Sequence, residues 1–156
     1  MGRKKNNELL LLSHFRRNAR ESLTKISRKT SIPVSTIFDR LKSYENGLIK
    51  KHTVLLDFNK LGYMARANAM LQLSSESRVA AKEFLLKNNV VNSLYKINNG
   101  FDYFVELICK DMKELEQFLE DLEQKFQIKQ KMVFYIIEDL AREKFMTEPD
   151  LIRLEN

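Results

Sequence analysis

The chain has 156 residues, of which 44 % are hydrophobic and 31 % charged, with a formal net charge of +6. These values are ordinary for a folded soluble protein of one medium domain or two small ones. No apolar run can cross a bilayer and no signal-peptide pattern is present, so we expect a cytoplasmic protein without a membrane partner. The single cysteine, Cys109, excludes an intrachain disulfide.

The charge is distributed unevenly along the chain. Residues 1–60 contain 14 Lys and Arg against 5 Asp and Glu, a net charge of +9, whereas the rest of the chain carries −3. A basic first part on a mildly acidic remainder indicates that only the first part meets a polyanion. The alternative is a basic surface without a partner.

Residues 22–45 contain two short helical patterns with a break around Pro33, and a further helix is expected at residues 8–17. Ser22 is placed to cap the second helix with its hydroxyl. Pro33 is expected at the start of the third helix, where its missing N–H has no cost. Gly47 is expected to end that helix in the left-handed conformation.

The third helix, expected at residues 34–45, has two different faces when successive residues are placed about 100° apart. The buried face is expected to contain Val34, Ile37, Phe38, Leu41 and Tyr44. The polar face is expected to contain Ser35, Thr36, Asp39, Lys42 and Ser43, with Arg40 at its flank. A helix-turn-helix needs this arrangement, because one helix braces while the next lies in the major groove of DNA.

Residues 48–57 mix apolar and β-branched side chains with basic ones, which predicts a strand that forms a wing after the reading helix. Residues 58–63 read as a hinge, where Gly62 supports a turn. We therefore predict a winged helix-turn-helix domain over residues 1–57.

Beyond the hinge, strands alternate with helices. Strands are expected at residues 64–73, 90–97, 101–110 and 131–138. A helix opened by Ser74 or Ser75 is expected after the first strand, and one capped by Asp111 after the third. This βαββαβ order predicts a ferredoxin-like domain over residues 64–138, so the chain is of the α+β class. Residues 139–156 are expected to form a tail, with a short helix before Pro149.

The third and fourth predicted strands are apolar on both faces; Phe104 and Ile108, for example, alternate with Val105 and Leu107. Both helices of a ferredoxin-like domain lie on one face of its sheet. The other face is left bare, although monomers rarely leave so much apolar surface in water. We therefore expect a second copy to cover it, which gives a homodimer with two DNA-reading heads for a two-fold symmetric site.

This combination resembles the Lrp/AsnC (feast/famine) family of transcription regulators, from about residue 8 to about residue 138. The N-terminal marks are Ala19-Arg20, residues 32–37 (IPVSTI), Arg40-Leu41-Lys42, Glu45 and Gly47-Leu48-Ile49. The more specific signal is Gly100-Phe101-Asp102-Tyr103 before an apolar strand, with Asp111, Leu115 and Phe118 following. Phe38 and Asp39 depart from the family's usual small and basic residues in the reading helix, and Asn99 stands where threonine is common.

The resemblance implies a transcription regulator that binds double-stranded DNA sequence-specifically and is not an enzyme. It also implies a homodimer that can assemble further into an octamer, with an amino acid or a related small molecule as effector. No cofactor is expected, because the chain has no phosphate-binding glycine loop and no set of nucleophile and base. His14 and His52 lack the spacing of metal ligands, so no metal site is expected.

DNA contacts are expected from the third helix and from basic residues around it. Arg40 can bond a guanine edge with two donors, hydroxyls such as that of Ser35 suit phosphates or bases, and Asp39 can accept from a cytosine amine. The predicted set is Arg20, Arg28, Lys29, Ser35, Thr36, Asp39, Arg40, Lys42, Ser43, Lys50 and Lys51. The alternative for each residue is a solvated side chain.

An effector pocket is predicted at Asn98, Asn99, Gly100 and Asp102. The alternative is a hairpin turn, because Asn-Gly is a turn pair and an aspartate can bond the backbone of its own turn.

Two other functions remain open at this stage. Some proteins that resemble the family decarboxylate a tetrapyrrole in haem biosynthesis, which would need His and Arg side chains converging on a pocket; the two histidines lie in separate N-terminal segments. The other alternative is a ligand-sensing module whose first domain binds a protein partner, and the charge of +9 argues against it.

Overall fold

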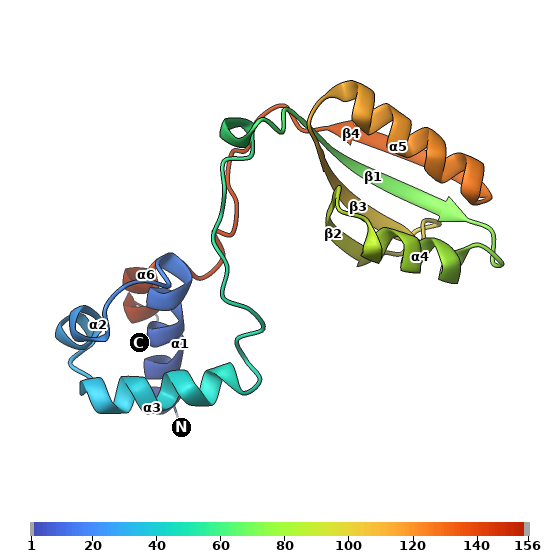
Figure 1. The fold of residues 1–156 in the computed structure, drawn as a ribbon. Coiled ribbons are helices and arrows are strands. Elements are labelled where there is room, and N and C mark those ends of the chain that lie inside the picture. The colour runs from blue at the N-terminus through green and yellow to red at the C-terminus, as the bar shows by residue number, and fades with distance from the viewer. Residues whose placement is uncertain (1, 155–156) are drawn as a thin grey trace. The chain divides into compact units, whose positions relative to one another are not determined.

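The computed structural model describes the backbone of residues 2–154 and the side chains of residues 6–152. The chain forms two compact units, so the polypeptide passes between them twice (Figure 1). The helical unit combines the residues up to Leu55 with those from Leu140 onward, and the sheet unit is Leu56–Asp139. None of the described helices is both long and apolar enough to cross a lipid bilayer.

The helical unit contains α1 (Gly2–Arg17), α2 (Leu23–Thr30), α3 (Val34–Glu45) and α6 (Pro149–Leu154). As predicted, Ser22 caps α2, and its hydroxyl accepts from the backbone N–H of Lys25 at 3.3 Å. The helix ends at Ser31, which has a left-handed φ of 58°. Pro33 precedes α3 as its N-cap rather than as its first residue. This sharp turn between two short helices confirms the helix-turn-helix.

The helical unit has a small core. Its buried side chains are Leu11, Ile26, Ile32 and Ile37, with Phe15 and Leu23 packed at the edge. On α3, Ile37 and Tyr44 are buried, whereas Val34 and Phe38 are 41 % and 46 % exposed, so the prediction that both face the core is wrong. At about 100° per residue, Tyr44 points only about 20° away from Ile37, but Phe38 points about 100° away, beyond the stripe that so small a core can cover.

The end of α3 also differs from the prediction. Gly62 and Gly100 have positive φ, but Gly47 does not. The carbonyl oxygen of Tyr44 instead accepts from the N–H groups of Gly47, Leu48 and Ile49 at 3.2, 2.9 and 2.8 Å. These bonds close the turn after α3 on the carbonyl of Tyr44, with Gly47 outside the left-handed region.

The predicted wing strand is wrong for the described chain, because residues 49–57 contain no strand. A strand is stable only when a neighbouring strand supplies hydrogen bonds. All strands of the described sheet come from later in the chain and pair with one another, so this segment has no partner strand among them. Side chains such as Val54 and Leu55 are left exposed. The hinge does contain the expected turn: the short helix η1 (Asn59–Leu61) ends at Gly62, whose φ is 86°.

The sheet unit contains one antiparallel sheet with the strand order β2-β3-β1-β4. The strands are β1 (Ala65–Leu73), β2 (Val91–Lys96), β3 (Tyr103–Cys109) and β4 (Ile128–Tyr135), and the connecting helices are α4 (Arg78–Lys87) and α5 (Met112–Lys125). This confirms the ferredoxin-like βαββαβ arrangement and the α+β class.

Some boundaries differ from those predicted. Ser77, rather than Ser74 or Ser75, is the N-cap of α4, because Ser74 begins a turn whose carbonyl accepts from the N–H of Ser77 at 3.1 Å. β4 begins and ends earlier than predicted, since its length follows from pairing with β1, where Leu73 lies opposite Ile128. α1 extends back to Gly2.

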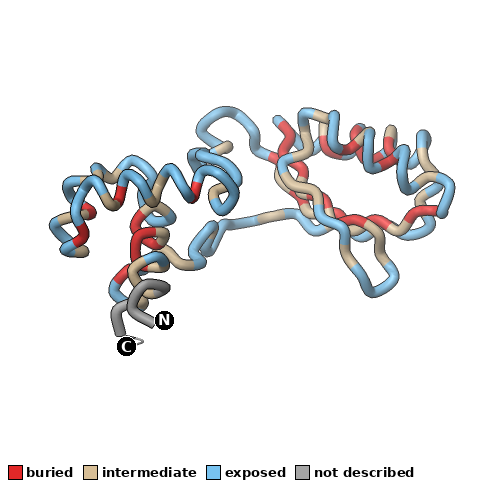
Figure 2. Tube along the Cα trace, turned by 90° about the horizontal axis from the view of Figure 1, so that it is seen from below, coloured by how far each residue is buried: buried red, intermediate tan, exposed pale blue. Residues whose placement is uncertain are grey.

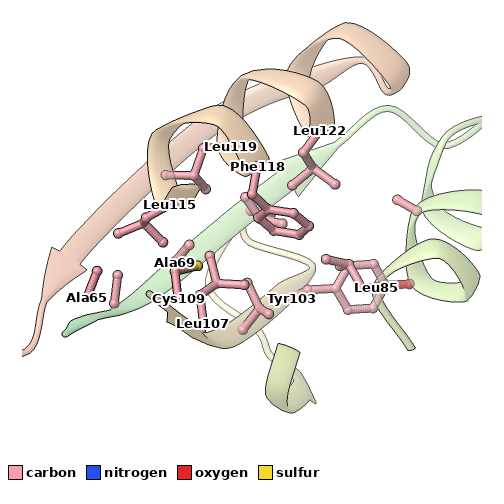
Figure 3. Packing of buried hydrophobic residues seen from close by; sticks show 14 of the residues in the cluster. Ala65, Ala69, Leu85, Tyr103, Leu107, Cys109, Leu115, Phe118, Leu119 and Leu122 are labelled. Carbon is pink, nitrogen blue, oxygen red and sulfur yellow. The ribbon is translucent and has the colours of Figure 1, made fainter. Parts of the chain in front are cut away.

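The core of the sheet unit lies between the sheet and its two helices. Asp111 caps α5 as predicted and accepts from the N–H of Glu114 at 2.8 Å. Leucines of α5 point toward small side chains of β1, such as Ala65 and Ala69, which let the helix lie close to the sheet (Figure 3). In Figure 2 the buried positions of the sheet unit accordingly follow the strands and one side of α5.

The residues after Leu140 return to the helical unit, where α6 packs against α1. The guanidinium of Arg16 on α1 pairs with the carboxylate of Glu143 at 3.0 Å and donates to the carbonyl oxygens of Glu143 and Phe145, each at 3.2 Å. Pro149 is buried and starts α6, whereas the sequence pattern placed a short helix before this proline.

Candidate nucleic-acid interface

The exposed face of α3 is formed by two neighbouring rows of side chains spaced four residues apart. One row contains Ser35, Asp39 and Ser43, and the other contains Val34, Phe38 and Lys42; all six are exposed. Thr36 is half-buried. Most of the predicted polar face is therefore accessible, with a hydrophobic side chain in its middle.

Phe38, like Val34, lies on this face although the sequence predicted it in the core. The ammonium group of Lys42 lies 4.6 Å from the centroid of its ring, a cation–π contact between side chains one turn apart. The sequence gives the angle of about 100° between Phe38 and Ile37 but not the width of the core, which decides whether Phe38 is covered.

Arg40, the predicted guanine reader, lies at the inner flank of α3. Its Nη1 atom and the hydroxyl of Tyr44 are both buried. Burial raises the pKa of Tyr44, and Glu8 raises it further, whereas the nearby Arg40 lowers it. The guanidinium of Arg40 thus lies close to the buried hydroxyl of Tyr44. This position suits a side chain that stabilises the helical unit better than one that contacts DNA bases.

Most of the predicted phosphate contacts lie outside α3, in other parts of the helical unit. Arg20, Arg28, Lys29, Lys50 and Lys51 are all exposed. The ammonium of Lys29 pairs with the carboxylate of Glu21, which also lies 3.0 Å from Nδ1 of His14 on α1. Lys29 and His14 together lower the pKa of Glu21, with Lys29 the larger cause. This cluster links α1 to α2, and part of the Lys29 charge is compensated there.

The predicted effector residues fall into two groups. Asn98, Asn99 and Gly100 are exposed, and Asn99 and Gly100 have φ values of 62° and 88°, as a type I′ hairpin turn requires. The N–H of Phe101 closes the turn by donating to the carbonyl of Asn98 at 3.4 Å. These three residues therefore form the hairpin that was the alternative.

Asp102, the fourth of these residues, makes contacts outside the hairpin turn. Its carboxylate accepts from the N–H of Leu73 at 2.8 Å and pairs with the guanidinium of Arg78, also at 2.8 Å. It joins the end of β1 to the start of α4. An open cleft of about 240 Å³ lies at the other end of the β2–β3 hairpin, lined by Phe58, Leu61, Tyr63, Asn89, Val90, Val91, Asn92 and Ile108. None of the predicted effector residues lines it.

The face of the sheet opposite the helices is apolar at its centre. Met70 lies across from both Phe104 and Met132, and Phe104 lies across from Tyr95, so these side chains share the bare face. Phe134, opposite Asn68, adds to it and is 47 % exposed.

One end of this bare face carries a cluster of polar side chains that sequence reasoning missed. The carboxylate of Glu106 accepts from the guanidinium of Arg66 at 2.8 Å, from the hydroxyl of Ser93 at 3.0 Å and from the amide of Asn92. Burial alone raises the pKa of Glu106, but these hydrogen bonds outweigh it and hold the pKa below its ordinary value of 4.5.

Glu106→Gln is expected to lower the free energy of unfolding by about 1–2 kcal/mol at neutral pH, because it weakens a charge-assisted network. Since the folded pKa is depressed, the carboxylate stabilises the wild type fully above about pH 4.5 and loses this effect as the pH falls through the folded pKa. Urea titrations at pH 7 and pH 3, at one protein concentration, should show the difference narrowing in acid. Glu120→Gln, at an exposed position of α5, is the control. An equal difference at both pH values would contradict this account.

Similar proteins were found by both sequence and structure. No family model matches the chain. The transcriptional regulator AzlB of Bacillus subtilis is 30 % identical over 115 residues, covering 71 % of this chain and 73 % of AzlB. The structure of AsnC from E. coli superposes with a TM-score of 0.79 and 17 % identity, covering 90 % of this chain and 97 % of AsnC. A transcriptional regulator from Neisseria meningitidis, solved with L-methionine, gives a TM-score of 0.80 at 16 % identity, covering 87 % and 91 %.

A helix-turn-helix with an exposed third helix, joined to a ferredoxin-like sheet, defines a two-domain transcription regulator. The match to AzlB is longer than either unit of the chain, so it includes parts of both. The chain belongs to the Lrp/AsnC family of transcription regulators.

Proposed function

We propose that this chain is a homodimeric regulator that binds double-stranded DNA sequence-specifically through the exposed face of α3. The observation that carries the proposal is the position of Ser35, Asp39 and Lys42 on one accessible face of the second helix of a helix-turn-helix. Hydroxyl, carboxylate and ammonium groups are suited to base edges and phosphates in a major groove. Exposed cations before and after α3 in the sequence, such as Arg28 and Lys50, supply positive charge that the phosphate backbone of a duplex attracts.

The dimer in this proposal forms through the bare face of the sheet. Side chains from all four strands contribute, including Met70, Tyr95, Phe104 and Phe134. A two-fold axis through this face would bring each apolar side chain against the same surface of the second copy. Two reading helices held by one dimer match two half-sites of a symmetric DNA sequence.

We also propose an amino acid as the effector. Support comes from the Neisseria meningitidis regulator that was solved with L-methionine. In this chain Asn98 and Asn99 present amide groups on an exposed turn, where they can contribute to a site completed by another copy.

Lys42→Ala is expected to weaken DNA binding and to reduce the slope of log affinity against log salt by about one, as for the loss of one phosphate contact. Mobility-shift titrations measure both effects when they are run at several salt concentrations on a duplex selected from a random pool. Repeating the titrations of the wild type with an amino-acid mixture tests whether an amino acid changes the affinity for DNA. Lys113→Ala, at an exposed lysine of α5, is the matched control and should bind as wild type. A wild-type protein with no salt-dependent affinity for duplex DNA would overturn the proposed function.

A further inference from the structure

The centre of the exposed face of α3 is aromatic. Phe38 lies between Val34 and Lys42 in one row and is flanked by Ser35 and Asp39 in the other. Nearly half of its side chain is exposed, and the helical unit already has a closed core without it. A side chain of this size on a helix face is restrained here by the ammonium of Lys42 above its ring.

The same face has no exposed arginine, because the α3 arginine, Arg40, is half-buried with Nη1 inside the unit. A bidentate arginine–guanine contact, the commonest specific contact in the major groove, is therefore not what this face offers. The groups that it does offer are two short hydroxyls, one carboxylate, one ammonium, one phenyl ring and, in the first turn, the isopropyl group of Val34.

We propose that Phe38 is a specificity-determining residue that reads thymine through contact with its 5-methyl group. This methyl is the apolar group that the base pairs present in the major groove, and aromatic side chains are among those that contact it. Asp39, the next residue, can accept from the amine of a neighbouring cytosine, while Lys42 both restrains the ring and supplies charge. The inference rests on the proposed DNA-binding function and adds the base that α3 selects.

The test replaces the thymines of the selected duplex, one at a time, by deoxyuridine, which lacks only the 5-methyl group. For the wild type, at least one replacement in each half-site should weaken binding by about fourfold, the effect of one apolar carbon. Phe38→Ala should bind the thymine duplex more weakly and should be insensitive to deoxyuridine at that same position. Phe38→Leu, which keeps an apolar side chain, should retain part of the sensitivity.

The matched control is Phe145→Ala, because Phe145 is 81 % exposed and lies in the segment before α6. It should keep the wild-type response to deoxyuridine, and thermal melting should show that all three variants are folded. If Phe38→Ala weakens binding equally with thymine and with deoxyuridine, or binds as wild type, the thymine inference is overturned while DNA binding stands. A wild type that binds no duplex would overturn the proposed function as well.

Discussion

Replacing Phe134 by aspartate is expected to convert the proposed dimer into monomers and to abolish detectable binding to a two-half-site duplex. Phe134 lies on the bare face of β4, next to Met132 along the strand direction, and is 47 % exposed in the single chain. A two-fold interface would bury the new charge twice, once from each copy, with no partner for either. A single unpaired buried charge already costs several kcal/mol, so the dimer constant should weaken by roughly a thousandfold or more.

Sedimentation equilibrium measures the dimer constant, and mobility shifts measure DNA binding. Leu86→Asp is the matched control, because Leu86 is 65 % exposed on α4, on the opposite side of the sheet. It should remain dimeric. The Phe134 variant should keep its far-ultraviolet circular dichroism, since the substituted side chain lies outside the core. A Phe134 variant that stays dimeric at micromolar concentration would show that another surface joins the copies.

Ending the chain after Asp139 is expected to unfold the helical unit while leaving the sheet unit folded. The truncation removes α6 from α1 and deprives Arg16 of the carboxylate and both carbonyls that it contacts. Loss of the buried Pro149 and half-buried Ile152 should cost about 3–5 kcal/mol, which is a large part of the stability of a small unit. Hydrogen exchange should show loss of protection in α1 to α3 but not in β1 and β3.

A pair of point variants tests the same packing without shortening the chain. Ile152→Asp places a charge at a half-buried position of α6, whereas Leu151→Asp changes the neighbouring exposed position. Only the Ile152 variant should raise the exchange rates of α1. Equal protection in both variants, and in the truncated chain, would contradict a stabilising role for α6.

The sequence was sufficient to predict those helices and strands that depend on residues close together in the chain. Alternation along β1 and β3 and the capping residues Ser22 and Asp111 were enough to predict the helix-turn-helix and the ferredoxin-like sheet. Two Asn-Gly pairs show the limit of local signals. Asn99-Gly100 joins two strands and adopts the positive φ values of a type I′ turn, whereas Asn46-Gly47 follows a helix and Gly47 lies outside the left-handed region.

The features that could not be predicted depend on contacts between distant residues. Arg16 pairs with Glu143, 127 positions later, and the pattern of α6 is too short to indicate a partner. The alternative for Asp102 was a bond to the backbone of its own turn, but its carboxylate accepts from the N–H of Leu73, 29 positions earlier. The exposure of Phe38 depends on the size of the core, which periodicity alone does not give. Whether Asn98 and Asn99 bind an effector, and which residues touch DNA, stay predictions.

The two crossings between the units have a consequence for binding. A head joined by one flexible linker keeps almost all of its rotational freedom and loses it when it docks on a duplex. Here two chain segments, one after residue 55 and one before residue 140, join the helical unit to the sheet unit. This double connection reduces the rotational freedom to be lost, and in the proposed dimer it raises the effective concentration of the second helical unit once the first has bound DNA.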